Sequence, residues 1–311
     1  MKKKRPVLRA HLIRNGMFLL FQLARVVPEK ILYGFVRRMS RLLYRYGHRN
    51  RECALRNIAL AMGPACAAEE VRAIYARSCR MMGEAVMDSL RYGVIPAEQV
   101  RRRIQMEGFE HIRQALAQGR GIVGVSAHLG SFPLLGCRLA LEGIPVSFIA
   151  RRLRERGLED AGLDFAHRLK LKIIFSRPVI TCLRWCMQAL NRNELVILAV
   201  DQNFGSEGVP IYFFGKTAKV PAGPLTLALR TQAVVLPMFI VRNPDNTHRL
   251  IIEAPVALQT GEKKELDERA NMQKIVAIIE SYIRAHPGQW MSWIHKRWEI
   301  AEPPENYLCN Y

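Results

Sequence analysis

The sequence lacks several of the patterns that would assign a function directly. Its seven cysteines contain neither a CxxC pair nor a zinc-like spacing, so they give no indication of a metal site. The glycines around Gly121 do not form GxGxxG, which leaves a dinucleotide-binding loop without support. Neither an internal repeat nor a low-complexity segment is evident in the 311 residues. We expect a globular chain that uses no metal and no bound cofactor.

A long apolar run and a signal-peptide cleavage site are also missing. The apolar run at residues 17–21 is interrupted by Gln22 and Arg25. A helix over residues 16–27 would reach only about 18 Å, against the roughly 30 Å of a bilayer's hydrocarbon core. No small-residue cleavage site follows the basic residues 1–5. We therefore expect no full transmembrane span, and we expect the cysteines to be reduced cytosolic thiols.

Acidic residues are scarce. Lys and Arg number 47 against 27 Asp and Glu, which leaves a formal net charge of +20, and residues 1–50 hold thirteen Lys and Arg against the single acid Glu29. A field of this sign attracts nucleic acid, an anionic membrane surface or an acidic carrier protein. Since no nucleic-acid-binding motif is present, a nucleic-acid-binding protein is the weaker alternative and no nucleic acid partner is expected.

Residues 1–50 are predicted to form basic amphipathic helices that associate with a membrane. After Pro28, apolar residues would share one helical stripe and arginines another: Leu32, Phe35, Val36, Met39 and Leu43 against Arg38, Arg41 and Arg45. Helices with apolar and basic stripes are typical of elements that lie in the bilayer interface. The alternative is an ordinary amphipathic helix packed on the protein's own core, with solvated arginines.

The remaining residues, 51–311, are predicted to form the main domain. Residues 51–118 are rich in Ala, Arg, Met and Glu and predict a helical scaffold. Over residues 120–311 strands alternate with helices, which predicts an α/β fold with a largely parallel sheet flanked by helices. The expected strands are 121–127, 145–150, 172–175, 195–200, 234–241 and 250–253, and the expected helices are 131–142, 158–171, 180–191, 223–231 and 266–285.

The stretch at residues 121–136 predicts a buried strand that ends at a histidine. Its first half is short, apolar and bounded by glycines, as expected of a strand covered on both faces. Gly130 then permits a sharp turn, Ser131 is a candidate helix N-cap, and Pro133 fits the first helical turn. His128 would thus lie at the carboxyl end of a strand, where open α/β sheets place their chemistry.

Polar residues end two further strands. Arg151 follows the second expected strand and Asp201 the fourth. In parallel neighbouring strands these residues would meet His128 at one rim of the sheet. A neutral imidazole would serve as general base, a carboxylate would fix its tautomer, and a guanidinium would bind an anionic group. The alternative for Asp201 is a plain helix or turn cap.

Motifs spread over nearly the whole chain occur in a characteristic order. They are Arg51-x-x-Ala54-x-x-Asn57-Ile58, Ser126-Ala127-His128-x-Gly130-Ser131, Arg151, Asp201-Gln202-Asn203-Phe204-Gly205, Val209-Pro210-Ile211-Tyr212-Phe213-Phe214-Gly215, Thr217-Ala218-x-Val220-Pro221-x-Gly223-Pro224, Ala233-Val234-Val235-x-Pro237 and His286-Pro287-x-Gln289-Trp290-x-x-Trp293-x-His295-Lys296-Arg297-Trp298. No single motif is decisive. Together they resemble the bacterial late acyltransferases of lipid A biosynthesis, the lauroyl and myristoyl transferases of Kdo-lipid A.

This resemblance implies a fold shared with glycerolipid acyltransferases, an acyl-carrier-protein thioester as donor, and work at the cytoplasmic face of the bacterial inner membrane. The carrier protein, anionic membrane lipid and a lipid acceptor would be the partners. One departure stands out, because the family motif is H-x-x-x-x-E or H-x-x-x-x-D and Pro133 occupies the acid's position here. Either Asp201, or behind it Glu207 or Asp164, orients His128, or the protein is an impaired or inactive lipid-binding relative.

The predicted mechanism is direct acyl transfer with His128 as general base. Arg151, or backbone N–H groups near Gly130 and Ser131, would stabilise the oxyanion or hold a phosphate. Phe132, Leu134, Phe213 and Phe214 are candidates to line an acyl slot, and Trp290, Trp293 and Trp298 are candidates for an aromatic belt at the membrane interface. Plain core packing is the alternative for both aromatic groups.

Overall fold

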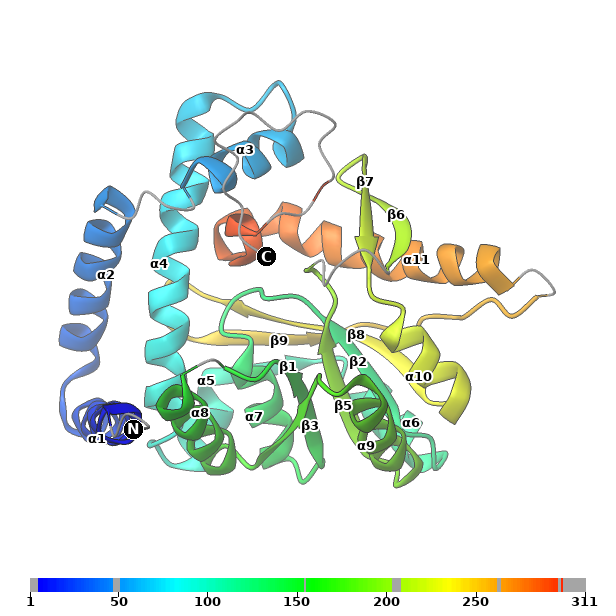
Figure 1. Ribbon diagram of the computed structural model, residues 1–311, viewed down its shortest axis with the longest axis horizontal. Coiled ribbons are helices and arrows are strands. Elements are labelled where there is room, and N and C mark those ends of the chain that lie inside the picture. Colours follow the sequence, from blue (N-terminus) through cyan, green and yellow to red (C-terminus); the bar gives the residue numbers. More distant parts are fainter. Residues whose placement is uncertain are drawn as a thin grey trace.

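The computed structural model describes residues 5–46, 51–153, 155–202, 208–261, 264–295 and 298. Figure 1 shows a central sheet covered by helices, with two N-terminal helices at one side. In spatial order the sheet contains β1 (Ile104–Glu107), β9 (His248–Ile252), β8 (Val234–Arg242), β2 (Ile122–Ser126), β5 (Leu195–Ala199), β3 (Val146–Ala150) and β4 (Leu171–Phe175). Every neighbouring pair is parallel except β8 with β9. The predicted α/β fold with a largely parallel sheet is confirmed.

The two faces of the sheet pack into two hydrophobic clusters. Neighbouring residues of β2 point to opposite faces, so Ile122 belongs to one cluster and Val123 to the other. The cluster of Ile122 includes residues of α5 (Ala97–Arg103), α6 (Phe109–Ala117), α7 (Pro133–Leu141) and α8 (Arg156–Arg168). The cluster of Val123 includes residues of α3 (Arg51–Met62), α4 (Ala68–Tyr92), α9 (Val179–Asn191), α10 (Gly223–Thr231) and α11 (Lys264–Ala285). Burial of both faces explains why β2 is apolar without alternation.

Three local predictions need correction. Residues 51–118 are not helical throughout, because residues 104–107 form β1 at the sheet edge, where pairing with β9 supplies hydrogen bonds that local propensity does not reveal. An antiparallel hairpin of β6 (Val209–Phe213) and β7 (Lys216–Val220) was not among the expected strands. Cys53 is disulfide-bonded, so it is not the reduced thiol expected, whereas the other cysteines of the described residues are free.

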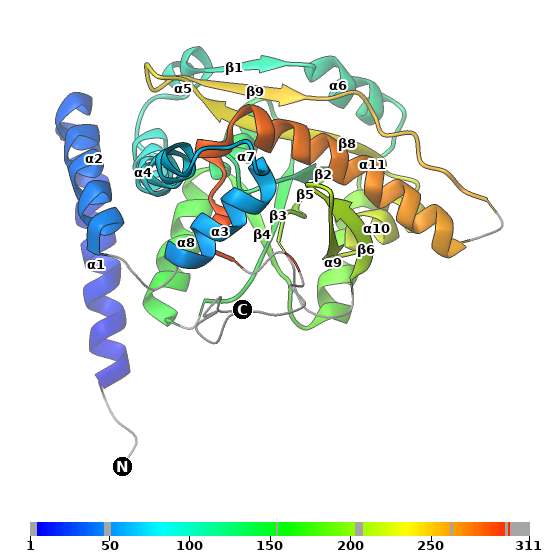
Figure 2. The same cartoon turned by 90° about the horizontal axis from the view of Figure 1, so that it is seen from above.

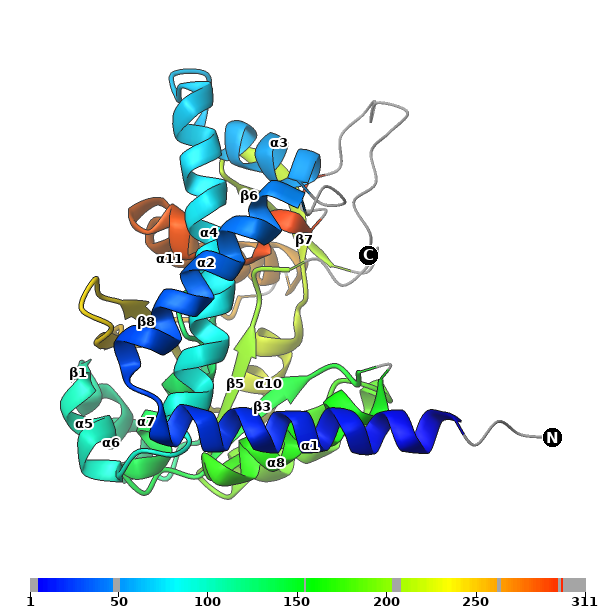
Figure 3. The same ribbon diagram turned by 90° about the vertical axis from the view of Figure 1, so that its left-hand side faces the viewer.

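The N-terminal helices lie outside α4, away from the sheet (Figure 2). Helix α2 (Glu29–Tyr46) packs along α4, and α1 (Arg5–Val26) packs along α8, as Figure 3 shows. The predicted apolar stripe of α2 is divided between two environments, since Val36 is buried against α4 while Phe35 and Met39 are exposed. In the part of the chain that the structure describes, no helix has the length and hydropathy to cross a membrane.

A buried carboxylate, Asp88 on α4, joins α2 and the sheet to the turn after β2. Its two oxygens accept hydrogen bonds from the Tyr33 hydroxyl of α2, the Ser131 hydroxyl, Arg242 Nε at 3.0 Å and His248 Nε2 at 3.1 Å. Burial raises the pKa of Asp88, but its donors, His248 first, lower it overall. The Asp88 carboxylate therefore holds α2, the turn after β2, β8 and β9 against α4.

Asp88→Asn should lower the free energy of unfolding by about 3–5 kcal/mol, because it leaves the buried Arg242 charge without this partner. Urea unfolding followed by circular dichroism measures the change. The matched control is Glu107→Gln, which breaks an exposed ion pair with Arg249 and should cost under about 1 kcal/mol. Equal losses in the two variants would contradict the role given to Asp88.

Candidate active site

The imidazole of His128 contacts the carboxylate of Asp201 at the carboxyl edge of the sheet. His128 follows β2 and Asp201 follows β5, and these strands are parallel neighbours. His128 Nδ1 lies 2.8 Å from Asp201 Oδ1, and the His128 backbone N–H donates to Asp201 Oδ2 at 3.1 Å. The predicted meeting of these two residues is confirmed. In the tautomer that the contact favours, Nδ1–H donates to the carboxylate and Nε2 keeps its lone pair.

Asp201 is held by donors from the C-terminal part of the chain. Trp290 Nε1 donates to Asp201 Oδ2 at 2.7 Å and the Ser292 hydroxyl at 2.9 Å. The Met291 N–H donates to the carbonyl of His128 at 3.0 Å, so the segment that fixes the acid also fixes the base. Asp201 is fully buried while the His128 side chain is 31% exposed. This arrangement leaves the imidazole open to a substrate on one side.

The paired charges shift both pKa values. Burial alone would lower the pKa of His128, but the negative charge of Asp201 and the hydrogen bond to it raise that pKa above 6.5. Burial alone would raise the pKa of Asp201, but the charge of His128 and the hydrogen bonds from His128 and Trp290 lower it well below the usual range. Asp201 therefore stays ionised at neutral pH, as a carboxylate that orients an imidazole must.

Arg151 and a second histidine complete the polar rim. Arg151 follows β3, which pairs with β5 on the side away from β2, and its side chain is exposed. Burial lowers the pKa of His295, and the charges of His128 and Arg151 lower it further against the opposing charge of Asp201. His295 therefore lies within the field of both residues. Sequence reasoning assigned no role to His295, although it belongs to one of the quoted motifs.

The backbone N–H of Gly130 is not the free oxyanion donor expected of it. The Gly130 N–H already donates to the carbonyl of Gln289 at 3.1 Å. The Ser131 side chain is buried and donates to Asp88, and it does not cap the following helix, whose N-cap is Phe132. The Gly130 N–H and the Ser131 hydroxyl are thus committed within the protein, where they hold the turn after His128.

The aromatic residues divide between the site and the core. The ring of Phe132 lies 5.5 Å from that of His128 and is half-buried, so it borders the site. Phe213 and Phe214 are buried and pack against each other and against tryptophans. Their contacts support the alternative of core packing and do not place them along an acyl slot. Leu134 is likewise a core residue of α7.

The aromatic belt predicted at the C-terminal end is wrong. Trp290, Trp293 and Trp298 are each at most 2% exposed, so they cannot lie at a membrane interface. They pack against Phe213 and Phe214, and Trp290 donates to Asp201. In sequence, a Trp-rich motif is equally consistent with a membrane belt and with buried core residues. The sequence therefore did not reveal that Trp290 donates a hydrogen bond to Asp201.

Asn57, on α3, holds this C-terminal segment in place. Its amide Nδ2 donates to the carbonyls of Trp293 at 2.8 Å and His295 at 2.9 Å. Glu207, a candidate orienting acid, lies outside the described residues. The other candidate, Asp164, is exposed on α8, whereas Asp201 occupies the position beside His128. Within the described ranges, no group of three or more His, Cys, Asp or Glu side chains is placed to hold a metal ion.

The sequence profile of the bacterial lipid A biosynthesis acyltransferases matches residues 1–299. The chain belongs to this family. It is 25% identical over 285 residues to the lipid A biosynthesis palmitoleoyltransferase of Escherichia coli (strain K12), a match that covers 91% of this chain and 89% of that protein. Identity to the lauroyltransferase of lipid A biosynthesis from the same strain is 25% over 290 residues, covering 92% and 90%.

A relative whose name gives another lipid is similar over a shorter part of the chain. The phosphatidylinositol mannoside acyltransferase of Mycolicibacterium smegmatis is 27% identical over 229 residues, covering 70% of this chain and 71% of that protein. All three relatives are named acyltransferases, and the chain is accordingly an acyltransferase. The names of these relatives refer to two different lipids, lipid A and phosphatidylinositol mannoside.

The turn that carries His128 in the acyltransferase requires glycine at position 130. Gly130 has φ +57°, and a Cβ there would lie 2.2 Å from the carbonyl oxygen of Ile240. Gly143 also has a positive φ, +80°, but a Cβ there would meet nothing within 4 Å. Alanine at position 143 would therefore introduce backbone strain alone, whereas alanine at position 130 would add a steric overlap.

Gly143→Ala should cost about 1–2 kcal/mol of stability from the left-handed conformation alone. Gly130→Ala should cost about 1–3 kcal/mol more, because the overlap with Ile240 forces the turn to move. Chemical unfolding measures both free energies, and transfer activity should fall in Gly130→Ala only. If the two variants lose the same stability and keep the same activity, the turn does not depend on close packing at position 130.

Proposed function

We propose that the acyltransferase moves a fatty acyl chain from an acyl-carrier-protein thioester to a hydroxyl or amine of a lipid A precursor or related lipid. The contact between His128 and Asp201 carries this proposal, because it supplies an oriented base with one exposed side. The names of the E. coli relatives support lipid A as the acceptor class. The family membership supports the fold shared with glycerolipid acyltransferases.

In this mechanism His128 Nε2 removes the proton from the acceptor as its oxygen or nitrogen attacks the thioester carbonyl. The carbonyl oxygen becomes an oxyanion, near which the positive charge of Arg151 is favourable. Collapse of the tetrahedral intermediate breaks the carbon–sulfur bond, and the imidazolium returns its proton to the departing thiolate. Asp201 stays ionised and stabilises the imidazolium throughout. The scheme uses no covalent enzyme intermediate and no cofactor, and the acyl-carrier-protein thioester is the donor substrate.

The position of Asp201 also bears on the alternative of an inactive lipid-binding relative. That alternative arose because Pro133 stands where the resemblance implies an acid. Pro133 begins α7, and the orienting carboxylate comes from the neighbouring strand. An imidazole already oriented by Asp201 needs no acid at position 133, which supports a working site.

Transfer by the wild-type enzyme should rise with pH through an apparent pKa above 6.5, because the base is active only when His128 is neutral and Asp201 raises its pKa. Asp201→Asn should lower kcat by about 10⁴-fold and move the midpoint to lower pH, since the charge that favours the imidazolium is gone. His128→Ala should lose as much, and the double variant little more. The measurement is the pH dependence of transfer from a labelled acyl carrier protein.

Asp164→Asn is the control, because it removes the same charge from an exposed position on α8 and should leave both rate and midpoint unchanged. If His128→Ala transfers the acyl chain at the wild-type rate, His128 is not the general base. A full loss in His128→Ala with no loss in Asp201→Asn would instead make Asp201 a structural cap.

We further propose that α1 and α2 attach the enzyme to the cytoplasmic face of the bacterial inner membrane. Their outer surfaces expose large apolar side chains: Phe18, Leu19, Leu20, Leu23, Val26, Ile31, Phe35, Met39 and Leu42. Arg38, Arg41 and Arg45 are exposed on α2 beside them. Apolar residues edged by arginines suit an element that lies in the interface with anionic lipid. The division of the chain at residue 50 remains a prediction.

Phe35→Asp with Met39→Asp should weaken sedimentation with anionic vesicles by at least about tenfold, because both side chains lose apolar area and gain charge repelled by the lipid. The control double variant is Ile180→Asp with Trp185→Asp on α9, where the side chains are also exposed but lie outside α1 and α2. If vesicle binding is weakened equally in both double variants, membrane attachment does not depend on the exposed apolar residues of α2.

A further inference from the structure

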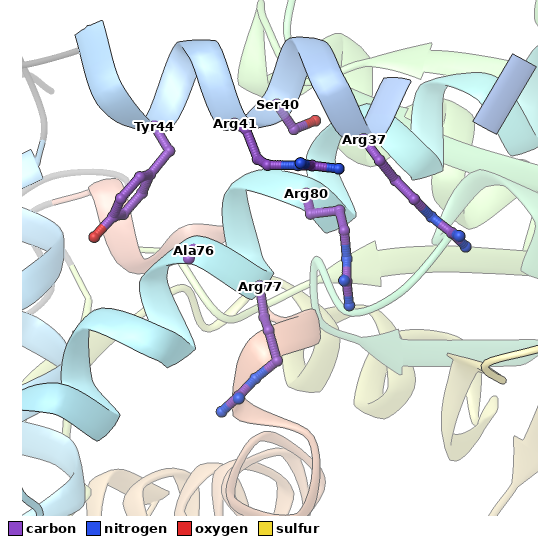
Figure 4. A pocket seen from close by; sticks show the side chains of 7 residues that line it. All are labelled: Arg37, Ser40, Arg41, Tyr44, Ala76, Arg77 and Arg80. Atoms are coloured by element: carbon purple, nitrogen blue, oxygen red, sulfur yellow. The ribbon is translucent and has the colours of Figure 1, made fainter. Parts of the chain in front are cut away.

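Helix α2 is fixed on α4 along its inner face. Tyr33, Val36 and Ser40 follow one another at about one helical turn, and each is at most 9% exposed. Gly83 of α4 permits the close approach, because a Cβ there would lie 2.8 Å from Ser40 Oγ and 2.9 Å from Val36 Cγ1. Nearer the end of α2, arginines of both helices border a cavity of about 210 Å³, as Figure 4 shows. The inner face of α2 is thus part of the packed interior, whereas its outer face is exposed.

The Tyr33 side chain links this inner face to the turn that carries His128. Its hydroxyl donates to Asp88 Oδ1, and the Ser131 hydroxyl donates to Asp88 Oδ2. Arg242 holds the carboxylate from another side, since its Nε donates to Oδ2 at 3.0 Å and its guanidinium lies 5.0 Å from the centre of the Tyr33 ring. Tyr33, Asp88 and Ser131 are each at most 2% exposed. Because water has no access to this cluster, solvent does not replace a hydroxyl that is lost from it.

The turn after β2 is held on two sides. On one side, residues 289–291 hold it through backbone hydrogen bonds. On the other side, the Ser131 hydroxyl is bound by Asp88 and lies 3.2 Å from His248 Nε2. Loss of the second hold lets the turn tilt about the first, which moves the His128 imidazole relative to its carboxylate partner. That contact is 2.8 Å long, and a displacement of about half an ångström would take it past the roughly 3.2 Å limit of a good hydrogen bond.

We propose that Tyr33 of α2 is a positioning residue for acyl transfer. It fixes the Asp88 carboxylate, which fixes Ser131 and thereby the turn of His128. This role rests on that of His128 as the proposed general base, and Tyr33 itself contacts no substrate, because its side chain is buried. The helix whose outer face is proposed to meet the membrane thereby supports the catalytic base with its inner face.

Tyr33→Phe tests this role by removing one hydroxyl. The ring stays and the Asp88 carboxylate keeps its charge, so the charges around the active site are unchanged while the turn loses support. Ser131→Ala removes the next link in the same chain of contacts. Tyr282→Phe is the matched control, because its hydroxyl also donates to a carboxylate, that of Glu253, in a pair outside the Asp88 cluster. Circular dichroism of the full-length variants establishes that each is folded.

The first measurement is the titration of the His128 imidazole by NMR of the full-length protein with labelled histidine. Against the effect of burial, Asp201 raises the pKa of His128 above 6.5, and a loosened contact weakens that effect. The midpoint should therefore fall by about half a pH unit in Tyr33→Phe and Ser131→Ala and stay unchanged in Tyr282→Phe. The second measurement is acyl transfer, in which kcat should fall about tenfold in the same two variants with KM unchanged, since neither hydroxyl faces substrate. The double variant should be no slower than the slower single variant, because the two hydroxyls act in one chain of contacts.

A wild-type titration and a wild-type kcat in Tyr33→Phe would overturn the positioning role. Equal changes in Tyr282→Phe would overturn it as well, because they would indicate a general loosening of the fold. If the losses add in full in the double variant, Tyr33 acts independently of Ser131 and the route through Asp88 is wrong. If the wild-type enzyme transfers no acyl chain, the proposed function fails, whereas the titration of His128 still decides whether Tyr33 holds the turn.

Discussion

The structure depends on the burial of one carboxylate beside a histidine. Asp201 has no access to water, and an ionised carboxylate in such a place is costly unless every oxygen is satisfied. Donors from His128, Trp290 and Ser292 meet that demand. They bring together the ends of β2 and β5 and a segment more than eighty residues further along the chain. The geometry that orients the base and the contacts that close the fold are thus the same contacts.

A second buried carboxylate, Asp88, is also surrounded by hydrogen-bond donors from several segments of the chain. Asp88 collects donors from α2, the turn after His128, β8 and β9 in the same way. Glu84 lies one turn earlier on α4 and pairs with three arginines. In a chain with an excess of 20 positive charges, these few acids are enclosed together with Arg242, whereas most of the other cations are exposed. The basic surface and the polar interior follow from one distribution of charge.

Strand and helix patterns predicted most of the sheet, because β2, β3, β5 and β8 are buried runs whose composition reflects their environment. The same reasoning brought His128 and Asp201 to one rim, since parallel neighbours share an edge. It failed at β1 and at the β6–β7 hairpin, where pairing partners decide the structure. It also failed at Trp290 and Ser131, whose side chains face buried carboxylates that local sequence does not reveal.

The order of these parts along the chain has a consequence for synthesis of the protein. His128 and Asp201 emerge from the ribosome well before residues 290–292, which supply two of the donors to Asp201 and the N–H that holds the His128 carbonyl. Until then the carboxylate lacks the partners that allow its burial. A nascent chain at that stage therefore has no finished catalytic centre. Chains broken off before Ser292 therefore lack contacts that hold Asp201 and His128 in place.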